Sequence, residues 1–473
     1  MGLSFGILYM LVLPPLSAPD ELRHYVTAYQ LSSCFLGQPS NSASGHVLVR
    51  AEDMWLEDVG GCYEYEAGED GYLRVKPQTA ENTWVLGATL TEDTYRTIRQ
   101  QGFSGRIYPE GTDADTLMVS IHSPVVTTPA GFVPQAFGMA LARLLGLNTL
   151  GLLYLGRLFN LLFFVGMTFL AIRRIPFGGE VMVGTALLPM TLHLSASLSY
   201  DVMIMGCLFY FTAVCLDLAY EKEQVEKRDV AVLMILMAAA GPCKMIYGVF
   251  MGLCLLIPVK RFGGWKGWVL SAAAVLGAWG IAMAAVNTRT ILSYATETES
   301  YVAWAEEPGY SLFYLIHHPI RLIQMFYQTI VWQAEHYHLT MIGAYLGNLD
   351  QILNVPYVVV VFFTVCLLCL AMKKPGEMLR MSGKDRVWVS VLCAACTAAA
   401  MLSMLIAWTA MSSQVIEGVQ GRYFLPFLPV LLMAFKNDTI ILTKNGNRSI
   451  LYLMCCANGY VLLRLYSVVS MRL

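Results

Sequence analysis

Two adjacent carboxylates and a histidine stand in a short polar segment directly after an apolar opening stretch. Asp20, Glu21 and His24 follow the pair Pro14 and Pro15, and prolines remove helix donors and clash with the preceding turn, so the opening helix must end or kink there. Asp20 and His24 are four residues apart and lie on one face of the next helix. A carboxylate there can accept a proton as a general base. The alternative interpretation is that these residues merely start a helix, because the helix dipole favours acidic residues in the first turn.

Three more charged residues stand at the ends of apolar segments. Asp201 opens one segment, Lys244 lies in a short turn, and Arg422 begins a segment between Gln420 and Tyr423. Arginine binds phosphate through two parallel N–H donors, whereas lysine acts as a point charge. Each residue alone could simply anchor its helix at the membrane surface. Their grouping at one membrane face would make a phosphate-binding site.

Arg157 is a different kind of candidate, because it lies inside the apolar segment Leu155-Gly-Arg-Leu-Phe-Asn160. A charged side chain within a membrane segment needs a partner in the bundle. A structural ion pair and a contact to a lipid phosphate are both compatible with the sequence.

Composition identifies the class of protein. The 473 residues are 56% hydrophobic and only 14% charged, whereas soluble domains carry about 25% charged residues. The sequence therefore predicts an all-α polytopic membrane protein in contact with the lipid bilayer. The net charge of -2 provides no basic excess to neutralise phosphates, so nucleic acid is not expected as a partner.

The distribution of Lys and Arg predicts the topology. Apolar segments follow the first helix at 151–172, 179–198, 201–219, 230–241, 243–258, 266–286, 355–372, 387–409, 422–435 and 450–469. Basic residues gather in the loops at 173–174, 221–228, 260–266, 373–386 and 436–448. The positive-inside rule places these loops in the cytoplasm. If the stretches 125–145 and 318–336 both lie along the outer interface, the chain makes about eleven crossings, with its amino terminus inside and Asp20 outside. If both stretches cross the membrane, three of the basic loops lie outside the cytoplasm.

Five regions follow from this topology. The first transmembrane helix at 1–16 is followed by a small, mixed α/β extracytoplasmic insert at 17–124. This insert begins with an interfacial helix and has β-like runs at 46–50 and 72–76. The other regions are a membrane core at 125–286 with a juxtamembrane segment at 125–145, a second extracytoplasmic loop with an interfacial helix at 287–350, and C-terminal transmembrane helices at 351–473.

Several motifs resemble those of a known family. They are Pro15-Leu-Ser-Ala-Pro19-Asp20-Glu21-Leu-Arg-His24 with Ala28-Tyr29 behind it, Lys244-Met-Ile-Tyr247, and Gly418-Val-Gln-Gly-Arg-Tyr-Phe-Leu-Pro426. The chain resembles a bacterial family of polytopic membrane proteins of unassigned function, related to the GT-C glycosyltransferases. The resemblance implies a GT-C-like bundle in the cytoplasmic (inner) membrane of a bacterium, with the active site facing outside.

The resemblance also implies an activity and residue roles. GT-C enzymes transfer a sugar from a polyprenyl-phosphate donor, here to a cell-envelope polymer or lipid acceptor. Asp20 would be the base, with Glu21 and His24 as further catalytic candidates, and Asp20 and Glu21 could hold a divalent cation, Mg²⁺ or Mn²⁺. By the resemblance, Arg422 would bind the donor phosphate. The residues themselves add Lys244, Tyr423, Gln420 and Arg157 as phosphate-binding candidates and Asp201 as an additional site candidate.

Two other functions remain open from the sequence. A transporter or flippase for an envelope lipid or polysaccharide intermediate would need broken helices and a polar path near the bilayer midplane. Apart from Arg157, however, mid-helix positions carry few charges. A purely structural assembly partner is the third interpretation.

Overall fold

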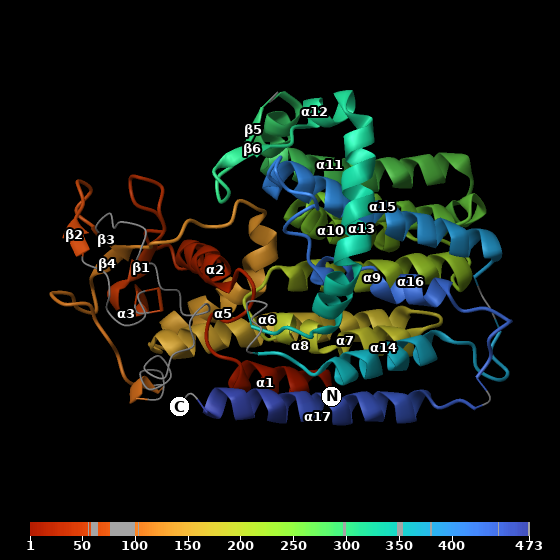
Figure 1. Cartoon of the computed structure of the whole chain (residues 1–473), viewed down its shortest axis with the longest axis horizontal. Helices are drawn as coiled ribbons and strands as arrows, with labels where there is room; N and C mark the ends of the chain where they lie inside the picture. Colours follow the sequence, from red (N-terminus) through yellow and green to blue (C-terminus); the bar gives the residue numbers. More distant parts are fainter. Residues whose placement is uncertain are drawn as a thin grey trace.

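The computed structural model describes residues 1–54, 56–57, 65–75, 100–102, 104–296, 299–347, 353–378, 381–442 and 444–471. Helices form a bundle, and a small β-sheet lies with α2 (Glu21–Phe35) beyond one end of that bundle (Figure 1). The fold is thus mostly helical, with few and short strands, as the composition predicts.

Five helices in the described part are long and apolar enough to cross a membrane. They are α6 (Thr149–Arg174), α9 (Asp201–Tyr220), α11 (Trp265–Thr296), α15 (Gly383–Trp408) and α17 (Asn447–Ser470). Almost every side chain of α9 is buried, whereas α11 exposes most of its apolar residues. α9 therefore forms the core of the bundle. Because exposed apolar surface of this extent is costly in water, α11 is suited to face lipid.

The eleven predicted crossings are not confirmed. The segment 179–198 forms two short helices, α7 (Gly179–Ala186) and α8 (Pro189–Ser195), because Pro189 starts a new helix after Leu188. The segment 422–435 forms a 3₁₀ turn, η6 (Gly421–Phe424), and the short helix α16 (Leu428–Ala434), separated around Pro426. Other predicted spans are short: α1 (Gly2–Val12), α10 (Lys227–Ala240), η4 (Met245–Leu256) and α14 (Tyr357–Ala371).

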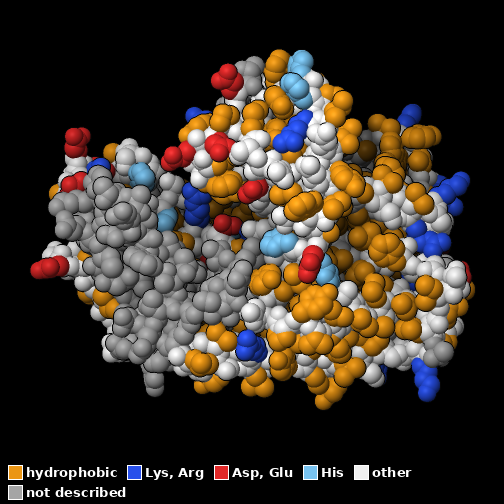
Figure 2. All heavy atoms as spheres, viewed as in Figure 1, with side chains coloured by type: hydrophobic (Ala, Val, Ile, Leu, Met, Phe, Trp, Pro, Cys, Tyr) orange, Lys and Arg blue, Asp and Glu red, His pale blue; other side chains and the backbone are white. Residues whose placement is uncertain are grey.

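All five basic loops meet at one end of the bundle. Arg174, at the end of α6, contacts Asp217 of α9 at 3.0 Å and Asp229 of α10 at 2.6 Å. Lys and Arg side chains accordingly gather along the right-hand edge of Figure 2. Asp201 begins α9 at the opposite end, and a 20-residue helix is about 30 Å long. Contacts that join the remaining basic loops include Val225 with Arg261, Tyr220, the last residue of α9, with Asp385, and Arg386 with Lys436.

The opposite end carries the insert and the segment 125–145. The sheet has the order β1 (Leu48–Arg50), β4 (Leu117–Val119), β3 (Leu73–Val75), β2 (Tyr65–Ala67), and α3 (Ala51–Met54) follows β1. The predicted β-like runs at 46–50 and 72–76 thus contain β1 and β3, while residues 58–64 and 76–99 of the insert lie outside the described part. In the segment 125–145, η2 (Pro129–Phe132) leads into α5 (Val133–Leu144), which packs on α2 and α6 and is too short to span a bilayer.

The remaining elements link these parts. α13 (Pro319–Ile342) packs on η6 and on α14, and it contains all but the first residue of the stretch 318–336 predicted to lie along the interface. The linking elements are η3 (Gly241–Cys243), η5 (Val259–Phe262), β5 (Ser300–Val302), β6 (Glu307–Gly309), α12 (Leu312–His317) and α13 (Pro319–Ile342).

Gly421 allows η6 to lie directly on the backbone of α13. Its N–H donates to the Thr340 hydroxyl at 2.9 Å, and a Cβ atom at this position would collide with the Tyr337 carbonyl oxygen and the Met341 nitrogen. Two backbones cannot move apart as easily as a flexible side chain can, so the glycine is required for packing.

We expect Gly421→Ala to lower the free energy of unfolding by about 1–3 kcal/mol, the usual cost of an overpacked site. Thermal unfolding of the purified protein in detergent would measure this. The control is Gly446→Ala, where an added Cβ meets no atom within 4 Å. Equal melting temperatures for the two variants would contradict the packing role.

Candidate functional site

Asp20 is held in an unusual backbone conformation that frees its side chain. It precedes the first turn of α2 with φ 57° and ψ 12°, and Leu16 also has a positive φ of 56°. Non-glycine residues adopt this region rarely and at a cost. The Asp20 carboxylate makes no capping hydrogen bond to α2, although aspartate is well suited to do so. Its side chain is 58% exposed and accepts a hydrogen bond from Arg422 Nη2 at 2.8 Å.

Asp20, Arg422, Asp201 and Lys244 form a row of alternating charge, here called the charge cluster. Arg422 Nε lies 3.6 Å from Asp201 Oδ2, and Lys244 Nζ lies 2.6 Å from Asp201 Oδ1. The four residues come from the start of α2, the start of α9, the turn before η4, and η6. The structure thus brings together residues separated by up to 402 positions. The cluster lies at the end of α9 opposite the basic loops.

Arg422 is buried but retains donors for a further ligand. Its side chain is 3% exposed, and among the described residues neither Nε nor Nη1 has a hydrogen-bond partner. The buried Gln420 Oε1 also has no partner in this part of the chain. Because a buried N–H without an acceptor is unfavourable, an anionic group beside Arg422 would be stabilised. A guanidinium has five N–H donors, so Arg422 can bind Asp20 and an anion together.

Aromatic rings support Lys244. Its Nζ lies 4.0 Å from the centre of the Tyr423 ring and 5.3 Å from that of Tyr200, which is a cation–π geometry. The Tyr247 hydroxyl donates to the Tyr423 carbonyl oxygen at 2.9 Å and fixes the start of η4 against η6. Sequence reasoning missed Tyr200, although its position directly before Asp201 was a usable signal.

His24 is buried next to the cluster. It is 2% exposed, and its ring contacts Tyr200 at 5.1 Å and Phe132 at 5.7 Å between centroids. Burial lowers the pKa of His24 to about 4, although Asp20 and Asp201 act in the opposite direction. The imidazole is therefore neutral at pH 7, where it supports the shape of the site and contributes no positive charge.

Glu21 faces away from the charge cluster, toward α6. Its two carboxylate oxygens accept hydrogen bonds from Arg157 Nε at 2.8 Å and Nη2 at 2.7 Å, and both side chains are almost fully buried. The N–H groups of Ala18 and Leu198 also donate to this carboxylate, and Arg157 donates to the Pro14 carbonyl oxygen. Of the two interpretations of Arg157, this geometry favours the structural ion pair.

The donors present do not fit a divalent cation bound between Asp20 and Glu21. Mg²⁺ and Mn²⁺ require several oxygen donors around one point, but the Glu21 oxygens are already bound by Arg157, Ala18 and Leu198. Among the described residues, no group of three or more His, Cys, Asp or Glu side chains is arranged to hold a metal.

We expect Glu21→Gln to destabilise the protein by about 3–5 kcal/mol, because it leaves a buried Arg157 without its counter-charge. The double variant Glu21→Met with Arg157→Met should recover part of that loss, since no charge is then buried. Chemical unfolding in detergent would measure both. The control Asp438→Asn removes a 67% exposed partner of Lys373 and should cost less than about 1 kcal/mol. A Glu21→Gln variant as stable as this control would contradict the structural role.

Comparisons with known proteins address the class of the chain. Neither the curated proteins nor the solved structures gave a match. A family described as "Predicted membrane protein (DUF2142)" matches residues 3–431. That range contains α1 except its first residue, the Glu21–Arg157 pair and all four residues of the charge cluster. Because the match covers nearly the whole sequence, the chain belongs to this family of predicted membrane proteins.

Proposed function

We propose that this protein is a membrane glycosyltransferase that transfers a sugar from a polyprenyl-phosphate-linked donor to a cell-envelope polymer or lipid acceptor. The observation that supports the proposal best is the pairing of Asp20, an exposed carboxylate, with Arg422, a buried guanidinium that has N–H groups to spare. One group can take a proton from a hydroxyl, and the other can bind a phosphate beside it.

The reaction assigns one role to each member of the cluster. The acceptor hydroxyl oxygen attacks the anomeric carbon, its proton passes to Asp20, and the bond from that carbon to the phosphate oxygen breaks. The polyprenyl phosphate leaves with the bonding electrons, stabilised by Arg422 and by Lys244. Asp201 holds both cations in place. Because Arg422 contacts both Asp20 and the donor phosphate in this proposal, the acceptor and the donor meet in a fixed geometry.

Gln420 and Tyr423 complete the donor site. The Gln420 side-chain oxygen can accept a hydrogen bond from a sugar hydroxyl, while the Tyr423 ring supports Lys244. Glu21, Arg157 and His24 are positioning residues in this proposal: the first two fix the corner before α2, and the third packs under it.

The same proposal places the site on the outer face of the cytoplasmic membrane of a bacterium. The positive-inside rule assigns the basic end of the bundle to the cytoplasm, and the charge cluster lies at the other end of α9. At that face, Asp20 can act on the hydroxyl groups of cell-envelope acceptors.

A transporter or flippase is the second candidate, and the break between α7 and α8 is the observation that favours it. Broken helices in transporters expose backbone groups to substrate near the midplane. Here, however, the Leu187 carbonyl oxygen at the break accepts a hydrogen bond from Asn458 Nδ2 at 2.8 Å, and Tyr9 binds the same Asn458 side chain. The break is therefore closed by α1 and α17, which makes transport the weaker proposal.

Reconstituted vesicles would test the leading proposal through transfer of radiolabelled sugar from polyprenyl-phosphate donors to envelope acceptors. Asp20→Asn should lower the rate by about 10²-fold or more, as for loss of a general base. Arg422→Lys keeps the charge but loses the second donor, so it should raise the donor KM and lower the rate. Asp438→Asn is the matched control at the basic end and should transfer normally. Movement of a lipid intermediate without sugar transfer would instead support the transporter.

The pH dependence of transfer should report Asp20. Burial raises the pKa of this carboxyl, but the charge of Arg422 and its hydrogen bond outweigh that effect and hold the pKa below its usual value of 3.8. A base with a lowered pKa is ionised at neutral pH and becomes protonated only in acid. We therefore expect a flat rate from neutral pH down to about 5, with loss only at or below about pH 4. A decline between pH 7 and 6 would contradict the assignment, because Asp20 stays ionised throughout that range.

A further inference from the structure

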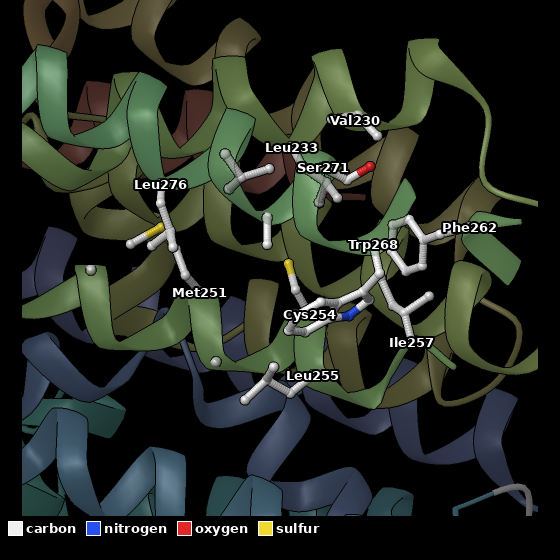
Figure 3. Close-up of a pocket in the computed structure, with 14 residues that line it drawn as sticks. Val230, Leu233, Met251, Cys254, Leu255, Ile257, Phe262, Trp268, Ser271 and Leu276 are labelled. Carbon is white, nitrogen blue, oxygen red and sulfur yellow. The ribbon is translucent and has the colours of Figure 1, made fainter. Parts of the chain in front are cut away.

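A cavity of about 330 Å³ lies between η4, α10 and α11, away from the charge cluster. Figure 3 shows side chains of these elements around it, among them Met251, Leu233 and Leu276. Its volume falls within the roughly 300–1,000 Å³ typical of ligand pockets. The lining is apolar apart from groups such as the Ser271 hydroxyl and the Trp268 indole. Such a lining suits an apolar chain and does not suit a polar metabolite.

The geometry of η4 explains why space remains here. This element is a 3₁₀ helix of 12 residues, whereas runs of more than three or four residues are uncommon. A 3₁₀ helix is narrower than an α-helix, and the small residues Gly248, Gly252 and Ala272 line the cavity. The narrow 3₁₀ backbone therefore contributes to the space, while Gly248 and Gly252 let η4 pack closely on Trp279 and Leu392.

The cavity is open to the surroundings of the bundle. Leu276 is 53% exposed and Leu255 is 56% exposed, and both line it. α11, which forms one wall, exposes most of its apolar residues. In a membrane these side chains meet lipid, so an acyl chain can enter the cavity sideways from the bilayer.

Positive charge and tryptophan mark one end of the cavity. The lining residue Trp268 packs edge-on against Trp265, which is 66% exposed, at 5.2 Å between ring centres. Tryptophan is enriched where a membrane meets water. Lys260 and Lys266 flank this end of α11 in sequence, are exposed, and form no ion pair within the described part of the chain. They can bind an anionic headgroup.

We propose that this cavity binds one acyl chain of an anionic phospholipid from the leaflet at the basic end, with the lipid phosphate bound by Lys260 and Lys266. The α11 residues in the lining, Trp268 to Leu276, belong to the first twelve positions of that helix counted from the basic end. The phosphate-binding groups of the charge cluster lie at the other end of the bundle. The occupant is therefore a membrane phospholipid and not the proposed sugar donor, and the site is independent of the proposed transfer reaction.

The test uses the full chain in nanodiscs of phosphatidylglycerol and phosphatidylcholine in equal amounts. Lipids retained after extraction into mild detergent are counted by native mass spectrometry. The parent protein should retain phosphatidylglycerol preferentially. Leu276→Trp fills the cavity and should abolish that preference, and Lys260→Ala with Lys266→Ala should lower it by about fivefold per lysine.

Matched variants separate binding from general damage. Leu270→Trp adds the same ring at a 74% exposed position of α11 that does not line the cavity, and Lys384→Ala removes another exposed lysine at the basic end. Both should retain phosphatidylglycerol like the parent, and melting temperatures would confirm that all variants are folded. Equal retention by Leu276→Trp and Leu270→Trp would overturn the proposal. So would preferential binding of a polyprenyl phosphate in the same competition, blocked by Leu276→Trp.

Discussion

The buried ion pair between Glu21 and Arg157 is the constraint on which the rest of the site depends. A charge inside a membrane bundle is tolerated only when it is paired and its other hydrogen-bonding groups are satisfied. Both conditions hold here, because backbone N–H groups complete the Glu21 carboxylate and a backbone carbonyl completes Arg157. The pair ties the corner between α1 and α2 to the first third of α6 and to the turn before α9, so three parts of the bundle are fixed at one point.

That constraint explains the strained backbone beside it. Positive φ angles at Leu16 and Asp20 cost about 1–3 kcal/mol each, and Asp20 also gives up a helix cap worth about 1 kcal/mol. Such a conformation persists only when its surroundings enforce it. With Glu21 held by Arg157, the preceding residue turns its carboxylate to the other side, where it reaches Arg422. Local stability is thus given up at the residue to which we assign the chemistry.

The sequence could predict which charges share an end of the bundle, but not which carboxylate has which partner. The Lys and Arg distribution separates the loop of Arg174 from Arg422, and the structure places these residues at opposite ends. Which of Asp20 and Glu21 reaches Arg422 depends on the backbone conformation of Asp20, and the spacing of residues in the sequence does not predict that conformation. The count of crossings is not confirmed for a related reason: hydropathy measures the length of an apolar run, but Pro189 and the 3₁₀ geometry of η4 decide which helices that run forms.

The alternating order of the charge cluster has a consequence for the proposed reaction. Before transfer, the charges of Arg422 and Lys244 are balanced by those of Asp20 and Asp201, so the cluster is neutral. When the acceptor proton reaches Asp20, one negative charge disappears and the cluster becomes positive. The leaving phosphate gains negative charge in the same step, so attraction to it is stronger in the transition state than in the ground state, which is the condition for catalysis. Asp201 fits its part because a carboxylate at the start of α9 is stabilised by the helix dipole, and so it holds both cations while Asp20 changes charge.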